Sequence, residues 1–176
     1  MNYGEILSEL KKYYPFGIPF MSPDYLSSKE FQNNRKVLKE QYEQESANLI
    51  NTKQELGRLL DSEIYIFAFA AGHFCLHYTF FIQGNPDKYY SILVSTIIPF
   101  YTIRILDIKT WETDFSSFQE KFPLNAKIIS EYIEEHFAGY QIITDNELLN
   151  RPIDGVEVDE SDHPNLLNLA FTSILT

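Results

Sequence analysis

The chain has 176 residues, of which 44% are hydrophobic, 22% charged and 15% aromatic, values that predict one globular domain with a ring-rich core. Its single cysteine excludes an internal disulfide framework and any metal site that needs several cysteines. The formal net charge of −11 opposes direct binding to nucleic acid or anionic lipid and favours basic partners.

The first part of the chain, residues 1–60, is predicted to be helical. Apolar side chains at helical spacing predict a short helix over residues 2–14, which ends at Pro15. An ordered loop follows, because the next segment contains three prolines and a glycine.

A second, much longer helix is predicted to begin near Ser27. Ser27 and Glu30 have the spacing of a capping box, and the apolar stripe that follows runs to about Leu60. This pattern indicates an amphipathic helix lying on an apolar surface. A long coiled coil is the weaker interpretation, because Glu45 and Thr52 interrupt the heptad pattern.

The middle part, residues 61–109, changes to β-branched and aromatic residues and predicts an antiparallel β-meander. The sequence Gly-Asn-Pro-Asp at 84–87 is a strong turn signal between two of its strands. The strands are expected at about 63–70, 74–83, 88–97 and 100–108.

The same segment has a competing interpretation as a hairpin of two transmembrane helices. Residues 64–86 carry no formal charge, and a second uncharged run, 89–103, follows almost at once. Histidine, glycine and proline would then lie at membrane depth, and the flanks lack the positive-inside signal. A sheet is therefore the preferred interpretation.

The last part, residues 110–176, is predicted to contain two helices and a strand. A short helix is expected at 113–121 and a firmer one from Pro123 to a glycine stop at Gly139. The final apolar run, "NLLNLAFTSIL", predicts a last strand that returns to the sheet. One face of the firmer helix is expected to be apolar and to comprise Leu124, Ile128, Ile129, Tyr132, Ile133 and Phe137.

Together these elements predict an α+β fold in one domain, residues 1–176. A four- or five-stranded, mostly antiparallel sheet is expected to pack on one face against the long N-terminal helix and the helix at about 124–138.

The segment His73-Phe74-Cys75-Leu76-His77 contains the side chains of the middle part that are most suited to metal binding or catalysis, two histidines and the single cysteine. Two histidines four residues apart resemble the helical zinc-protease motif, but that motif needs glutamate directly after the first histidine, and position 74 is phenylalanine. Catalysis of that kind is therefore excluded.

In a strand, His73, Cys75 and His77 lie on one face because side chains alternate. The two histidine Cα atoms are then about 13 Å apart, too far for both to bind one ion easily. A metal site would need further ligands from His136, His163 or distant acids. The preferred interpretation is a polar strand face covered by a helix or by a partner, and no metal or other cofactor is expected.

Other catalytic signatures are missing from the sequence. The seven glycines are scattered, so no phosphate-cradling loop can be recognised, and no G-x-S-x-G nucleophile elbow occurs. Carboxylate pairs such as Glu134-Glu135 lie on a predicted helix and are interpreted as solvated surface. The sequence thus favours a protein that is not an enzyme.

Nearly all of the negative excess lies in the last third. Residues 1–60 hold 8 acids and 8 bases, residues 61–109 hold 4 and 3, and residues 110–176 hold 13 and 3. The densest cluster is predicted to form a docking surface for a basic protein or, alternatively, a solvated loop. It comprises Asp154, Glu157, Asp159, Glu160 and Asp162.

This ending, "DGVEVDESDHPNLLNLAFTSIL", on a small acidic α+β chain resembles immunity proteins of bacterial polymorphic toxins and of contact-dependent or type VI secretion systems. Bacteroidetes-type members close in the same way, with a turn, an acidic stretch and an apolar strand. The resemblance covers the last quarter and implies a non-enzymatic inhibitor of a cognate toxin. It assigns no functional residue.

The leading expectation is therefore an acidic protein that binds a basic toxin, such as a nuclease, and covers its substrate cleft. Phe137, Tyr140 and the tyrosines of the sheet are the expected apolar anchors. No signal peptide is recognised, so the cytoplasm is the expected compartment.

Two alternatives remain open. The first is a small-molecule-binding or enzymatic domain with a pocket between sheet and helices, lined by His73, Cys75, His77 and Arg104. The second is a small membrane-associated protein built on residues 64–106. The sequence does not predict the oligomeric state.

Overall fold

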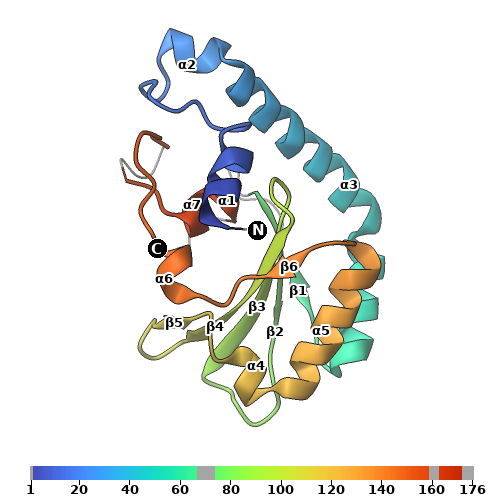
Figure 1. The fold of residues 1–176 in the computed structure, drawn as a ribbon. Coiled ribbons are helices and arrows are strands. Elements are labelled where there is room, and N and C mark those ends of the chain that lie inside the picture. Colours follow the sequence, from blue (N-terminus) through green and yellow to red (C-terminus); the bar gives the residue numbers. More distant parts are fainter. Residues whose placement is uncertain (1, 67–73, 159–162, 172–176) are drawn as a thin grey trace.

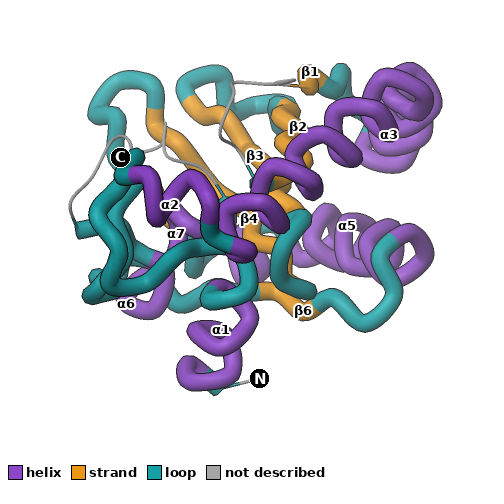
Figure 2. Tube along the Cα trace, turned by 90° about the horizontal axis from the view of Figure 1, so that it is seen from above, coloured by secondary structure: helices purple, strands orange, loops and turns teal. Residues whose placement is uncertain are grey.

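The protein has an α+β fold in which one β-sheet lies between two groups of helices (Figures 1 and 2). The structure is a computed structural model that describes residues 2–66, 74–158 and 163–171, including all of their side chains except those of 42–50. The predicted fold class is confirmed.

In the described residues the sheet has six strands, three of which are six or eight residues long and form most of it. Its order is β1-β2-β3-β4-β5 with every neighbouring pair antiparallel, and β6 pairs with β4 in parallel. The strands are β1 (Tyr65–Ile66), β2 (Cys75–Phe80), β3 (Lys88–Ser95), β4 (Phe100–Asp107), β5 (Thr113–Asp114) and β6 (Gln141–Ile142).

The central hairpins occupy the expected segments of the meander. Residues 81–87, which include a turn at Gly84 with a φ of 86°, join β2 to β3 where the Gly-Asn-Pro-Asp signal predicts a turn. The first predicted strand, 63–70, is confirmed only for the two residues of β1, because 67–70 lie outside the described residues. Within the part of the chain that the structure describes, no helix is both long and apolar enough to cross a membrane.

Three helices precede the sheet: α1 (Tyr3–Leu10), α2 (Pro23–Ser27) and α3 (Lys29–Leu60). The long amphipathic helix is confirmed, but its predicted capping box is wrong. Ser28 is the N-cap of α3 and accepts a hydrogen bond from the Phe31 amide at 3.1 Å, whereas Ser27 belongs to α2. An extra short helix before α3 shifts the cap by one residue.

The described residues after β5 form four helices: α4 (Phe118–Lys121), α5 (Pro123–His136), α6 (Asn146–Leu149) and α7 (Leu166–Ala170). The predicted last strand is wrong, because its first part forms α7; residues 172–176 lie outside the described residues. Asn165 and Asn168 form a reciprocal capping box with 2.9 Å hydrogen bonds that starts this helix. Its four apolar side chains are all buried, so no polar face reveals its helical period.

One face of the sheet packs against α4, α5 and the C-terminal end of α3; in Figure 1, α5 and this end of α3 lie on the right and α4 lies at the bottom. Leu56 and Leu60 of α3 and Ile129 and Ile133 of α5 contribute to this core, as their spacing predicts. Leu124 does not, since 70% of it is exposed. It lies in the first turn of α5 and faces solvent.

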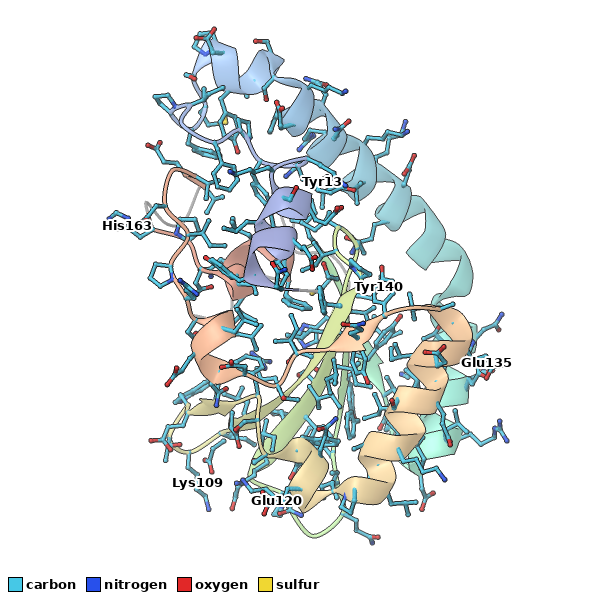
Figure 3. The ribbon with its side chains drawn as sticks, in the orientation of Figure 1. Tyr13, Lys109, Glu120, Glu135, Tyr140 and His163 are labelled. Carbon is cyan, nitrogen blue, oxygen red and sulfur yellow. The ribbon has the colours of Figure 1, made fainter. Side chains whose placement is uncertain are left out.

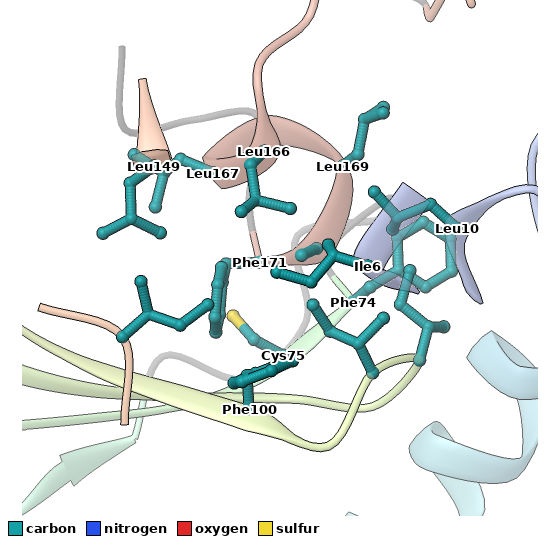
Figure 4. Packing of buried hydrophobic residues seen from close by; sticks show 14 of the residues in the cluster. Ile6, Leu10, Phe74, Cys75, Phe100, Leu149, Leu166, Leu167, Leu169 and Phe171 are labelled. Atoms are coloured by element: carbon teal, nitrogen blue, oxygen red, sulfur yellow. The ribbon is translucent and has the colours of Figure 1, made fainter. Parts of the chain in front are cut away.

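The opposite face packs against α1 and α7, so the sheet is covered on both sides (Figure 2). Ile6 and Leu10 of α1 meet Leu166 and Leu169 of α7 in this second core (Figure 4). The buried hydroxyl of Tyr14, just after α1, donates a 2.7 Å hydrogen bond to the Leu169 carbonyl. The N-terminal and C-terminal parts of the chain therefore form one layer.

Asp114, the last residue of β5, ties the sheet to α4. Its carboxylate accepts hydrogen bonds from the amides of Ser116 and Ser117 and from both serine hydroxyls, and it lies 3.6 Å from the Lys121 ammonium. Burial raises the pKa of Asp114, but the hydrogen bonds from Ser117 and Ser116 outweigh burial and hold the pKa well below its usual range.

We expect Asp114→Asn to lower the free energy of unfolding by about 1–2 kcal/mol at pH 7. A carboxyl whose folded pKa is depressed stabilises the fold above its unfolded pKa of about 3.9 and loses this effect as the pH falls. The difference between the two proteins should therefore shrink below about pH 4. Urea unfolding at several pH values measures it, with the exposed Asp154→Asn as control; a pH-independent difference would contradict the assignment.

Candidate functional site

Three residues of the pocket lining predicted from the sequence, Cys75, His77 and Arg104, lie on the same face of the sheet. His77 Nε2 lies 3.2 Å from the Thr79 hydroxyl, which is 3.1 Å from the Ser91 hydroxyl. An Arg104 Nη2 donates to the same Ser91 oxygen at 3.4 Å. Because Thr79, Ser91 and Arg104 are cross-strand neighbours, the chain of polar groups runs across β2, β3 and β4.

Cys75 shares this face but points into the apolar core. It is buried next to Phe100 and Phe171 (Figure 4). His73 lies outside the described residues. Among the residues that the structure describes, no group of three or more histidine, cysteine or acidic side chains is placed to hold a metal ion.

Arg104 is the least expected member of the face, since only 6% of it is exposed. Its buried Nε has no hydrogen-bond partner among the described residues. Burial lowers the pKa of Arg104 to about 10, while the neighbouring Cys75 acts weakly in the opposite direction. The guanidinium is thus held in an environment that opposes its charge.

The predicted acidic docking surface is described only at Asp154 and Glu157, both exposed; Asp159, Glu160 and Asp162 lie outside the described residues. Glu157 also has a structural task, because its carboxylate accepts a 2.9 Å hydrogen bond from the Phe20 amide. Next to it, the amide of Gly17 donates to the Gly155 carbonyl at 2.6 Å. The acidic loop is therefore fastened to the loop before α2.

A cavity of about 730 Å³ lies on the other face of the sheet, between α3, α5 and the start of β2. Because side chains alternate along β2, Leu76 and Tyr78 face this cavity, whereas Cys75 and His77 face the opposite side. The pocket expected between sheet and helices is present. Cys75, His77 and Arg104 lie across the sheet from it.

Hydrogen bonds fix the end of this cavity where α3 crosses the sheet. Gln41 of α3 donates to the Cys75 carbonyl at 3.1 Å and accepts from the Thr96 hydroxyl at 3.0 Å. On the other side, Tyr140 donates to the Ser95 carbonyl at 3.1 Å. Figure 3 shows Tyr140 where the chain passes from α5 to β6. The cavity walls are thus held by the backbone of the sheet.

The α5 side of the cavity carries stacked aromatic side chains. The His136 and Tyr132 rings stack with centroids 4.1 Å apart, and His136 Nδ1 lies 2.9 Å from the Tyr132 carbonyl, which can only accept. The other ring nitrogen, Nε2, lies 3.4 Å from the Glu55 carboxylate. Glu55 on α3 and His136 on α5 thereby connect the two helices.

Two residues that line this cavity, Phe137 and Tyr140, are predicted from the sequence as anchors for a partner and not as cavity lining. Tyr78 is one of the sheet tyrosines with the same prediction, whereas Glu40 and Glu55 are not singled out by the sequence, because their position at the cavity depends on how α3 crosses the sheet. The local signal is the spacing of Tyr132 and His136, four residues apart, which predicts a shared helix face without saying what that face meets.

Comparison with known proteins adds no relative. No protein-family model matches the chain, and neither does any curated protein or solved structure.

Proposed function

We propose that this chain is a non-enzymatic binding protein that neutralises a basic protein toxin, in the manner of a bacterial immunity protein. The proposal rests on one observation, the position of the acidic residues of the chain. Ten of the 13 acidic residues in 110–176 are in the described part, and nine of these ten are exposed. Their charge faces solvent, where a partner can meet it.

An exposed negative surface suits a partner whose active site binds phosphate. Enzymes that cut nucleic acid are positively charged where the phosphates lie, and an acidic protein competes for those groups. Complementary charge also speeds association, which matters for an inhibitor that must act before the toxin does.

Two exposed apolar side chains are suited to anchor the partner. Trp111, the only tryptophan, is 73% exposed in the turn between β4 and β5, with a φ of 61°. Met21, beside the acidic loop at 154–158, is exposed and also has a positive φ. Tryptophan is enriched among residues that dominate binding energy, and neither residue contributes its exposed surface to the core.

The test is co-expression of this protein with the basic domain of a secreted protein whose gene neighbours the gene for this chain. We expect a 1:1 complex, with growth restored to cells that express the domain and an association rate that falls steeply with salt. An unrescued toxic domain, or a rate that salt leaves unchanged, would overturn the proposal. Trp111→Ala should weaken the complex at least about tenfold if it is an anchor.

The predicted acidic surface can be tested in the same complex. Reversing Asp154, Asp159, Glu160 and Asp162 to lysine should slow association, whereas Glu157 is better changed to glutamine. Glutamine keeps an acceptor for the Phe20 amide, so a lost complex would not reflect a detached loop. An unchanged association rate would exclude this loop from the interface.

A second candidate function, small-molecule binding, is favoured by the cavity volume of about 730 Å³, which lies within the range of ligand sites. A stoichiometric small molecule released from the purified protein on denaturation, and seen by mass spectrometry, would support it over toxin binding.

A further inference from the structure

Arg104 differs from the other three arginines of the chain in being buried. Arg35, Arg58 and Arg151 are all exposed. Arg104 is only 6% exposed and lies on the sheet face that α1 and α7 cover. A buried charge is ordinarily paired with a group of opposite sign, because moving an ion out of water costs much free energy. The guanidinium of Arg104 therefore needs a counter-ion.

No carboxylate of the described residues supplies this counter-ion. The described ion pairs all involve other bases. After burial, which has the larger effect, the group that acts on the pKa of Arg104 is Cys75 and not an acid. Cys75 itself points into the apolar core beside Phe100 and Phe171 (Figure 4). Within the described part of the chain, the charge of Arg104 is left without an acidic partner.

The unused donors of Arg104 lie on one edge of its guanidinium. Nε is buried and has no hydrogen-bond partner among the described residues. Nη2, on the same edge of the guanidinium plane, donates a long hydrogen bond of 3.4 Å to the Ser91 hydroxyl. Two parallel N–H groups on one edge form the fork with which arginine binds anions.

Hydroxyl groups extend this set of donors along the sheet. Ser91 Oγ lies 3.1 Å from the Thr79 hydroxyl, which lies 3.2 Å from His77 Nε2. A hydroxyl that accepts a hydrogen bond from Arg104 still has one hydrogen to donate, either to its neighbour or to an ion. Ser91 is therefore placed to add an O–H donor to the two N–H donors of the fork.

We infer that the Nε edge of Arg104 binds a chloride ion together with the Ser91 hydroxyl. Chloride carries one charge and accepts hydrogen bonds from N–H and O–H groups without a directional requirement. Arg104, Ser91, Thr79 and His77 are each at most 8% exposed, so the site favours a monatomic ion over a larger anion. Such an ion can enter by local opening of the short helices α1 and α7. The inference is independent of the proposed function, because the ion binds the chain without a protein partner.

The Nε–H signal of Arg104 gives the most direct test. In ¹H–¹⁵N NMR of the whole chain, replacing sodium gluconate by sodium chloride at equal ionic strength should shift this signal, and the shift should saturate. Gluconate screens charge equally but is too large for the site. Arg104→Met assigns the signal by removing it, and the Nε–H signal of the exposed Arg35 should not follow the titration. An Arg104 signal that chloride leaves in place would overturn the inference.

Stability gives a second readout, because a ligand that binds the folded chain raises its melting temperature. The unaltered protein should melt at least about 3 °C higher in about 0.3 M chloride than in gluconate of equal ionic strength. Bromide should act as chloride does. Arg104→Met should remove the difference, whereas Arg35→Met should keep it. A chloride effect of the same size in Arg104→Met would mean that the ion acts elsewhere on the chain.

Ser91→Ala tests the site with the arginine in place, and it serves if Arg104→Met does not fold. Loss of one hydroxyl donor should weaken chloride binding by about three- to tenfold. An unchanged chloride affinity would overturn the assignment of Ser91 to the site. In gluconate, Arg104→Met should be more stable than the unaltered protein, because the buried charge then has no counter-ion. Chloride should narrow or reverse this order, and a difference that ignores chloride would contradict the inference.

Discussion

Phe80→Ala is expected to lower the free energy of unfolding by about 3–5 kcal/mol. Phe80 ends β2 and is fully buried. Its ring stacks on Tyr90 of β3 with centroids 5.7 Å apart and meets the Phe118 ring of α4 edge-on at 6.2 Å. Truncation removes the transfer energy of the ring and leaves a void that flat neighbouring rings fill poorly.

Urea unfolding with a two-state fit measures this loss, and Trp111→Ala is its matched control. Trp111 is 73% exposed, so removing an even larger ring there should change stability by less than about 0.5 kcal/mol. Its positive φ is no obstacle, since tryptophan and alanine share the same strain. A loss below about 1.5 kcal/mol for Phe80→Ala would mean that α4 is free to collapse onto the sheet.

The aromatic cluster around Phe80 also has a consequence for the cavity. Tyr90 contacts Phe122 with ring centroids 5.2 Å apart, and Phe122 directly precedes α5. The start of α5 is thus fixed to the sheet by rings, while its end carries Tyr132 and His136 into the cavity wall. The core on this face therefore sets the distance between α5 and α3.

The long elements of the fold were predictable because local pattern and tertiary packing agree in them. The amphipathic stripe predicts α3, and Pro123 at the start of an apolar period predicts α5. The turn at 84–87 fixes one hairpin. In each case one set of side chains meets the core and another meets water, so the period is visible in the sequence.

The sequence was misleading where both sides of an element are buried. In α7 every apolar side chain packs inside, so the run resembles a strand until the Asn165 cap is considered. The polar face of β2 raises the same difficulty. His77 and Thr79 suggest an open pocket, yet they are buried and the cavity lies across the sheet. Polarity in a strand does not say which side meets solvent.

The candidate cavity itself lay beyond the sequence for a different reason. Glu55 and His136 are 81 positions apart, and nothing local indicates that they lie 3.4 Å from one another. Their meeting depends on α3 and α5 packing on the same sheet face. Charge and aromatic content predict that such a surface exists, whereas only the packing of the two helices places it.

Arg104→Met is expected to stabilise the fold by about 1–2 kcal/mol at pH 7. Burial lowers the pKa of Arg104 to about 10, which corresponds to about 3 kcal/mol against the charged form, at 1.36 kcal/mol per unit. Against this gain stands one long hydrogen bond to Ser91, worth about 1 kcal/mol. Methionine keeps most of the length of the side chain and buries no donor.

The stability gain of Arg104→Met should depend on pH. A base whose folded pKa is lowered destabilises the fold at pH values below that pKa, and the cost disappears as the pH rises through about 10 toward the unfolded value. The advantage of Arg104→Met should therefore shrink above about pH 10. Urea unfolding at pH 7 and near pH 10.5 measures it, with the exposed Arg35→Met as control. A loss of more than about 2 kcal/mol at pH 7 would mean instead that the buried guanidinium binds a stabilising anion, because removing one partner of a buried charge pair costs that much or more.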